Sequence, residues 1–388
     1  MEHWIHWTRH FGPLSGSDPK VERATERYIL TTFPYGCNLG PAQAARHLRG
    51  AVTPHMLSFV NRRHVSADKL DAALRDLINQ YHVFRLPKLW GEGKTAAADG
   101  TKYDLYDQNL LAEYHIRYGG YGGIAYHHVA DSYIALFSHF IPCGVWEAVY
   151  IIDGLLKNRS DIQPDTVHAD TQGQSAPVFA LAYLLGIKLM PRIRNWRDLV
   201  FYRPAQEATS VHSDPLFRDT IDWELLETHW HDLLRVVLSI KAGKLSSSML
   251  LRKLGNYSHK NRLYQAFREL GRVVRTVFLL RYISDLKLRE QITASTNKVE
   301  AYNGFAKWLF FGGSGVIADN DPEEQEKAIK YNDVVANAVI FQNVVDQTAI
   351  LRELMDISAA SLARGFSASA ASTPVQSSPP AFSSRART

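Results

Sequence analysis

Cysteine is scarce in this chain of 388 residues, which contains only Cys37 and Cys143. Two cysteines cannot form the disulfide framework of a small secreted protein, and no ligand pattern for zinc accompanies them. The N-terminal residues lack the basic and then apolar layout of a signal peptide, and no run approaches the roughly 18 apolar residues of a membrane span. We therefore expect a soluble protein in the reducing cytoplasm, with no membrane partner and no small-molecule substrate.

Acidic residues are nearly missing from one stretch, although the whole chain has 44 Lys and Arg against 39 Asp and Glu. Between Arg235 and Arg289 there are thirteen basic residues and only two acidic ones. Such an excess of one charge is the electrostatic footprint of a protein that binds a polyanion. Helices with solvated basic faces are the alternative, but the length of the stretch favours nucleic acid.

The first 88 residues have mainly helical periodicity. Leu70, Leu74 and Leu77 recur at helical spacing between Asp68 and Tyr81, and Ser66 is placed to cap that helix. We expect residues 1–88 to form a helical module of their own.

The pattern changes at Trp90-Gly91-Glu92-Gly93-Lys94, after which strands alternate with helices. A short strand is predicted to end near Asp99 and to be followed by an antiparallel meander. The later elements are a helix, an extended run, a second helix that stops at Gly186, and a strand. The expected ranges are 114–118, 123–129 and 132–141 for the meander, then 145–156, 165–170, 175–186 and 187–193. This order predicts a ribonuclease-H-like mixed sheet in which the strands that carry Asp99 and Asp170 are neighbours.

The strand pattern disappears between residues 200 and 293. Five apolar residues there recur at helical spacing and three arginines share a neighbouring face, namely Leu263, Phe267, Leu270, Val274 and Val277, and Arg268, Arg272 and Arg275. We interpret residues 200–293 as an all-helical basic insertion that buries its apolar face and presents the arginines to DNA.

The core is expected to resume over residues 294–355, with a helix from Thr296 to Phe311 that has Glu300 near its first turn. The sequence thus predicts an α/β protein with a ribonuclease-H-like mixed sheet, a large all-helical insertion, a preceding helical module and a disordered tail. The expected boundaries are 1–88, 89–199, 200–293, 294–355 and 356–388.

Three acidic residues in different local contexts are the candidate catalytic residues. They are Asp99 in Ala-Ala-Ala-Asp-Gly-Thr-Lys, Asp170 in His-Ala-Asp-Thr-Gln-Gly-Gln, and Glu300 in Asn-Lys-Val-Glu-Ala-Tyr-Asn. Singly, an Asp-Gly pair is usually a turn and a helical Glu is usually a solvated charge. A catalyst that cuts and rejoins phosphodiesters with two divalent cations, however, needs carboxylates from separate elements at one point. We therefore interpret the three as a DDE triad that holds metal.

Two further sets of residues have side chains of the kinds found at binding sites. Arg192, Arg194 and Arg197 surround a tryptophan after the last predicted strand, a composition compatible with DNA contact as much as with an ordinary surface. His127 and His128 lie in a predicted strand, so their imidazoles should point to opposite faces and cannot chelate one metal.

The segments around the three carboxylates resemble the catalytic domain of Tn3-type transposases. The resemblance rests on Trp-Gly-x-Gly-Lys-Thr-Ala-Ala-Ala-Asp-Gly, His-Ala-Asp-Thr-Gln-Gly-Gln, and Asn-Lys-Val-Glu-Ala-Tyr-Asn followed by Phe-Phe-Gly-Gly, and it covers roughly residues 1–355. It implies two Mg²⁺ ions, replaceable by Mn²⁺, for cleavage at transposon ends and strand transfer in replicative transposition. It also implies terminal inverted repeats and target DNA as partners, a homodimer at synapsis, and a bacterial protein associated with the nucleoid.

The chain also departs from the family pattern. In the family, terminal-repeat recognition domains precede the core, and this sequence does not contain them. After about Met355, where the family continues with a helical segment, this sequence has a segment rich in Ser that contains three Pro. A segment of that composition cannot build a core and is expected to be disordered. We therefore expect a truncated copy. The alternative is a catalytically inactive remnant that binds DNA through its basic insertion.

Overall fold

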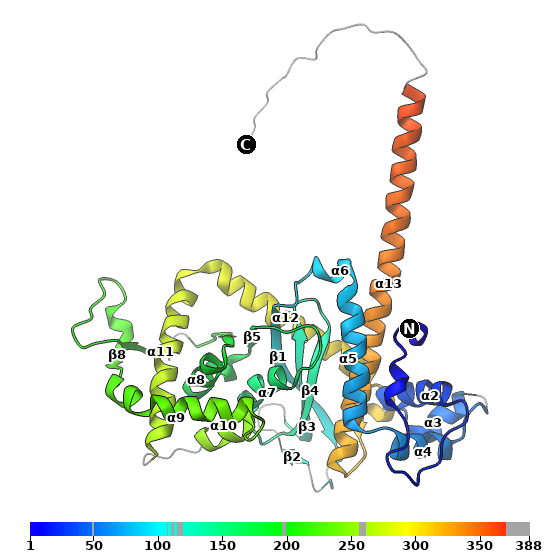
Figure 1. Cartoon of the computed structure of the whole chain (residues 1–388), viewed down its shortest axis with the longest axis horizontal. Coiled ribbons are helices and arrows are strands. Elements are labelled where there is room, and N and C mark those ends of the chain that lie inside the picture. The colour runs from blue at the N-terminus through cyan, green and yellow to red at the C-terminus, as the bar shows by residue number, and fades with distance from the viewer. Residues whose placement is uncertain are drawn as a thin grey trace. The chain divides into compact units, whose positions relative to one another are not determined.

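A computed structural model describes residues 1–48, 50–106, 108–109, 112–114, 119–195, 199–255 and 261–369 (Figure 1). The chain divides into one unit that spans Met1–Gln342 and a second that begins at Asn343. Within the described residues the fold is a mixture of helices and strands with one mixed sheet, so the predicted α/β class is confirmed.

The first 88 residues are helical, as predicted. The helices are α1 (Glu2–Ile5), α2 (Ala24–Gly36), α3 (Gly40–His47), α4 (Pro54–His64), α5 (Ala67–Val83) and α6 (Arg85–Lys88). The Ser66 side chain accepts a hydrogen bond from the Lys69 backbone N–H and caps α5, as expected. These helices pack directly on the rest of the unit, because Tyr81 donates to the Ser132 carbonyl at 2.6 Å and Asn38 donates to the Gly312 carbonyl at 2.8 Å.

The sheet has the strand order β2-β3-β1-β5-β6, with β4 also paired to β3 and β9 to β1. The strands are β1 (Thr95–Leu105), β2 (Glu113–Tyr114), β3 (Tyr121–Ala130), β4 (Ala135–Pro142), β5 (Thr166–Ala169), β6 (Lys188–Pro191) and β9 (Val316–Ile317). The meander of β1, β3 and β4 is antiparallel, whereas β5 is parallel to both β1 and β6. The predicted neighbourhood of the Asp99 and Asp170 strands is therefore confirmed. Residues 115–118 of the expected first meander strand lie outside the described part.

The first strand is longer than predicted. It was expected to end near Asp99, but it runs through Asp99 and Gly100 to Leu105, because residues up to Asp104 pair with β3 and Leu105 pairs with β9. Before the strand, the Gly93 backbone N–H and the Thr95 hydroxyl donate to the two oxygens of Asp131, at 2.8 and 3.2 Å. The glycine-rich segment is thus a turn fixed by the carboxylate at the β3–β4 connection.

Helices cover both faces of the sheet. The α7 helix (Tyr150–Lys157) lies against one face, where His128 Nε2 is 2.9 Å from the Ile151 carbonyl. On the other face lie α12 (Leu286–Leu309) and α13 (Pro322–Ser369), where His127 meets Asn303 and Asp333. The prediction that the two adjacent histidines point to opposite faces is confirmed.

The region after the last core strand is not all-helical, so that part of the prediction is wrong. Between α8 (Ala176–Leu185) and the long helices, β7 (Phe201–Arg203) and β8 (Phe217–Thr220) form a small parallel sheet. The helices are α9 (Trp223–Lys241), α10 (Ser247–Gly255) and α11 (Arg262–Ser284). The rings of Phe201 and Phe217 pack 5.6 Å apart, which stabilises strands too short to show a period of two in sequence.

Two boundaries also differ from the expectation. The α12 helix begins at Leu286, where Asp285 accepts a hydrogen bond from the Leu288 N–H, so Glu300 lies in mid-helix and not in its first turn. The α13 helix continues to Ser369, so the first part of the expected disordered tail is helical; residues 370–388 lie outside the described part.

The described part contains one helix that by length and composition could cross a membrane, Pro322–Asp356 of α13. Length and composition alone are weak evidence for a span. The start of this helix belongs to the core instead, since Tyr331, Asp333 and Phe341 are all fully buried.

The packing of α11 against α8 can be tested at a glycine where the two helices meet. Gly271 of α11 lies against α8, and a Cβ at this position would come 1.8 Å from the Ala176 carbonyl oxygen, whereas a Cβ at Gly304 of α12 would meet nothing within 4 Å. Gly271→Ala should therefore lower the free energy of unfolding by about 1–3 kcal/mol. Gly304→Ala should raise it by about 0.5–1 kcal/mol, because alanine restricts the unfolded chain. Urea denaturation of both variants measures the difference, and equal stabilities would contradict the packing.

Candidate active site

The register of two parallel strands brings the first two candidate carboxylates together. Ala98 of β1 lies opposite Ala169 of β5, and each is followed by an acidic residue, Asp99 or Asp170. Asp170 ends its strand and begins the short helix η3 (Thr171–Gln174). Both residues line a cavity of about 10 Å³, which is room for about one water molecule or a small cation.

A third carboxylate, which sequence reasoning missed, lines the same cavity. Glu147 begins the short helix η2 (Glu147–Val149), is only 7% exposed, and accepts a hydrogen bond from Gln172 Nε2 at 3.2 Å. Its side chain occupies the space beside Gly100, where a Cβ would come 2.3 Å from Glu147 Oε2. A glycine inside a strand often marks such a close approach, and this was the available signal.

Glu300 approaches from the helix that covers the sheet. Its side chain is 48% exposed and Oε1 lies 3.8 Å from Arg192 Nη1. One turn later on the same helix, Asn303 Nδ2 donates to Asp99 Oδ2 at 3.3 Å. The structure therefore places Glu300 on the solvent side of the carboxylates and near enough to influence Asp99 electrostatically.

The electrostatics of the cavity are unfavourable for an ionised Asp99. Burial is the largest cause that raises the pKa of Asp99 to about 7, and the charges of Asp170 and Glu147 act in the same direction. A smaller contribution comes from Glu300, while the hydrogen bond from the Gly100 backbone N–H opposes the shift. Mutual repulsion of carboxylates around a small space is what a bound cation relieves.

The predicted DNA-contacting arginines fall into two groups. Arg192 and Arg194 lie at the carboxylates, with Arg194 Nη2 3.4 Å from Asp170 Oδ1. Their side chains are 30% and 46% exposed, so both can reach solvent. Arg197 lies outside the described residues.

The three arginines of α11 that were expected to contact DNA are partly buried. Arg272 forms an ion pair with Glu269 at 2.6 Å and stacks 4.5 Å over the ring of Tyr202 in β7. Burial lowers the pKa of Arg275, and Arg268 is half-buried as well. The expected open basic face is thus partly used for packing between α11 and the small sheet.

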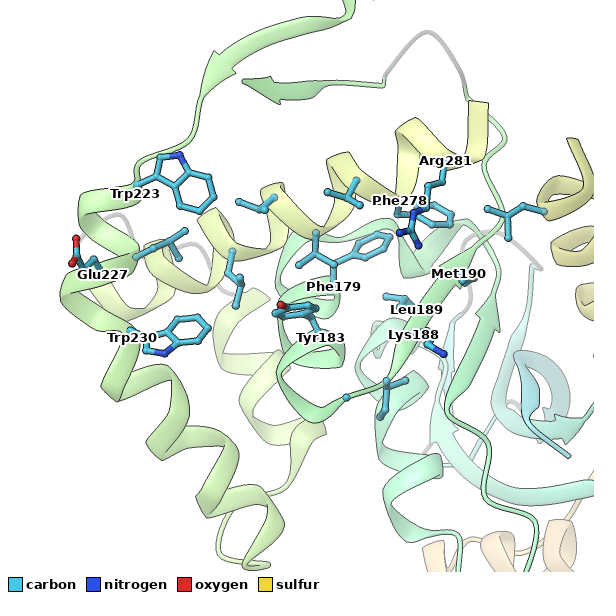
Figure 2. A pocket seen from close by; sticks show the side chains of 18 of the residues that line it. Phe179, Tyr183, Lys188, Leu189, Met190, Trp223, Glu227, Trp230, Phe278 and Arg281 are labelled. Atoms are coloured by element: carbon cyan, nitrogen blue, oxygen red, sulfur yellow. The ribbon is translucent and has the colours of Figure 1, made fainter. Parts of the chain in front are cut away.

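A much larger cavity lies elsewhere, in the helical region. It has a volume of about 1080 Å³ and is formed by α8, β6, α9 and α11. Figure 2 shows Trp223 and Trp230 extending from α9 toward Phe179 and Tyr183 of α8. None of the predicted catalytic or DNA-contacting residues lines it.

Comparison with known proteins identifies the family. The family model of the Tn3 transposase DDE domain matches residues 1–368. The chain belongs to the Tn3 transposase DDE domain family. It is 32% identical to the transposase for transposon Tn501 of Pseudomonas aeruginosa over 349 residues, which are 89% of this chain and 35% of that protein.

Other relatives of this DDE domain agree. The transposase for transposon Tn1546 of Enterococcus faecium is 32% identical over 81% of this chain and 32% of its own length. The transposase for transposon gamma-delta of Escherichia coli strain K12 is 29% identical over 87% of this chain and 34% of its own. The chain thus spans about a third of the length of these relatives.

A DDE domain implies a requirement for divalent cations in general. The residues fit such a group, because Asp99, Asp170 and Glu147 surround the cavity with carboxylate oxygens, the ligands that hard cations take. Within the described part, no three Asp, Glu, His or Cys side chains already lie close enough together to hold a metal ion.

The raised pKa of Asp99 predicts a pH-dependent stability. Between about pH 4 and pH 7 the folded protein keeps a proton that the unfolded chain has lost, so stability falls across this range and Asp99 is destabilising above it. Asp99→Asn should therefore raise the free energy of unfolding, and with it the melting temperature, more at pH 8 than at pH 5; the difference in free energy is on the order of 2 kcal/mol.

Thermal unfolding of both proteins at the two pH values, without divalent cations, measures this difference. Asp165→Asn is the control, since Asp165 pairs with Lys188 at the surface and its pKa is lowered by the Thr166 and Lys188 hydrogen bonds. An equal effect of Asp99→Asn at pH 5 and pH 8 would contradict the electrostatic account.

Proposed function

We propose that this chain is the catalytic domain of a transposase that cleaves DNA at transposon ends and transfers the strands to target DNA in replicative transposition. The observation that supports it most is the meeting of Asp99 and Asp170 at one cavity with Glu300 on the adjacent helix. In this proposal residues 89–199 and 294–355 form a ribonuclease-H-like core, interrupted by the insertion of residues 200–293.

The three acidic residues are proposed to hold two Mg²⁺ ions, with Mn²⁺ as a substitute. When bound, such a pair of cations activates a water for attack on a phosphate and stabilises the departing oxygen. Asp99 must lose its proton to act as a ligand, so neutral to alkaline pH favours cation binding. Glu147, which accepts a hydrogen bond from Gln172, adds a further carboxylate to the wall of the cavity.

Arg192 and Arg194 are proposed to hold backbone phosphates at the site. Each now contacts a catalytic carboxylate at the long distance of 3.8 or 3.4 Å, and a phosphate is a stronger partner for a guanidinium. The proposed DNA partners are terminal inverted repeats and target DNA. Joining two ends requires two active sites, so we also propose a homodimer at synapsis and association with the bacterial nucleoid.

The triad predicts loss of cleavage without loss of DNA binding. Asp99→Ala, Asp170→Ala and Glu300→Ala should each reduce Mg²⁺- or Mn²⁺-dependent nicking of supercoiled plasmid at least 100-fold, because each removes a proposed ligand. Asp165→Ala is the matched control, a surface aspartate that should cleave as the wild type does. Nicking at the wild-type rate by any triad variant would refute its assignment, and a wild type that binds but never cleaves would indicate the inactive remnant.

Replacing an arginine beside the carboxylates and replacing one on α11 should have different effects on DNA binding and stability. Arg194→Ala should weaken binding to duplex DNA several-fold and lower the slope of log K against log salt by about one, since one phosphate contact is lost. Arg272→Ala should leave that slope unchanged and lower the melting temperature, because it loses the Glu269 and Tyr202 contacts. Fluorescence anisotropy over a salt series distinguishes them, and the reverse pattern would place the DNA on α11.

A further inference from the structure

A buried chain of polar side chains leads from the cavity into the core. Asn303 Nδ2 lies 3.3 Å from Asp99 Oδ2, and Asn303 Oδ1 lies 2.8 Å from His127 Nδ1. On its other side, His127 Nε2 is 3.1 Å from Asp333 Oδ1. Asn303 is 5% exposed, and His127 and Asp333 are completely buried. Three elements, β3, α12 and α13, are thereby linked to one carboxylate of the site.

The donor and the acceptor can be assigned for the hydrogen bonds between Asp99, Asn303 and His127. Because the Asn303 amide nitrogen donates to Asp99, its oxygen faces His127 and can only accept, so His127 donates from Nδ1. Asp333 is likewise an acceptor, and its Oδ1 lies 3.1 Å from His127 Nε2 on the other side of the ring. If the Asn303 amide were rotated by 180°, its oxygen would face the Asp99 carboxylate, and two acceptors would be in contact.

Asp333, at the inner end of this row of polar side chains, is held by several hydrogen bonds and ion pairs. Burial alone would raise the pKa of Asp333, but His127, the Ser138 hydroxyl and Lys330 together lower it below its usual value. The Tyr302 hydroxyl donates to Asp333 Oδ1 at 3.0 Å, and Ser138 donates to the other oxygen. Lys330 in turn binds Asp71 of α5 at 2.7 Å and the Ser138 carbonyl at 2.8 Å.

A buried ionic network of this kind is a poor source of stability. Removing charges from water costs several kcal/mol per ion, and well-packed apolar residues often stabilise a core equally well. What a buried network of hydrogen bonds does supply is a fixed geometry. Here that geometry ends on Asp99, and Asn303 is one helical turn from Glu300.

We propose that Asn303, oriented by His127 and Asp333, is a positioning residue that aims the Asp99 carboxylate into the cavity and fixes α12, with Glu300, at a set distance from it. The inference rests on the proposed function, in which these carboxylates bind divalent cations. Groups that orient metal ligands in this way typically change metal affinity 10- to 100-fold when removed.

The test is Mn²⁺ affinity of the full chain without DNA, measured from the electron paramagnetic resonance signal of free Mn²⁺ at pH 8. Asn303→Ala should weaken Mn²⁺ binding at least about 10-fold. Asn303→Ser, whose hydroxyl is too short to reach Asp99, should do the same and carries the test if the alanine variant does not fold. The matched control is Asn337→Ala. Asn337 is a fully buried asparagine on α13 whose side chain binds the Ala135 backbone, and the variant should keep its affinity within about twofold.

A double variant tests whether His127 acts on Asp99 through Asn303. If His127 acts through Asn303, the double variant His127→Ala with Asn303→Ala should lose no more Mn²⁺ affinity than the stronger single variant. Losses that add in the double variant would remove His127 from the proposal.

Two outcomes separate this inference from the proposed function. If Asn303→Ala and Asn303→Ser bind Mn²⁺ as the wild type does while Asp99→Ala does not, the positioning role is wrong and the metal site remains. If Asp99→Ala and Asp170→Ala also bind as the wild type does, the metal site itself is wrong.

Discussion

The parallel pairing of β1 with β5 is the constraint on which the site depends. Its register places Asp99 beside Asp170, two acidic side chains that repel each other in a partly buried space. Basic and amide side chains contact these carboxylates and reduce the repulsion. Arg194 approaches Asp170, Arg192 approaches Glu300, and Asn303 donates to Asp99. A carboxylate cluster held in this way costs stability in the free protein and gains it when a cation enters.

Much of the fold could be predicted from sequence because its elements have clear periods. The helix after Ser66 and the antiparallel meander follow from apolar spacing and caps. The adjacency of the Asp99 and Asp170 strands follows from the order of strands and helices along the chain. The small sheet of Phe201–Arg203 and Phe217–Thr220 could not be predicted, since three or four residues show no period and their pairing depends on a tertiary contact. The start of α12 was missed for a similar reason, because the Asp285 cap lies in a sequence that already reads as helical.

Candidate residues could be named from sequence where they lie in a family motif, as Asp99, Asp170 and Glu300 do. The structure brings Asp99 and Asp170 to one cavity, whereas Glu300 lies on the adjacent helix and does not line it. Glu147 lies in no such motif, and only the glycine at position 100 hinted at its approach. The sidedness of α11 was also beyond sequence reasoning, because Arg272 turns toward Tyr202 and Glu269 through contacts that helical spacing does not determine.

The central claim is that the carboxylates at the β1–β5 junction form a divalent-cation site. Anomalous diffraction from crystals of the full chain soaked in Mn²⁺, recorded on both sides of the manganese absorption edge, tests it most directly. The account predicts an anomalous peak in the cavity bounded by Asp99 and Asp170. Manganese peaks confined to other acidic residues, with none at this cavity, would contradict it.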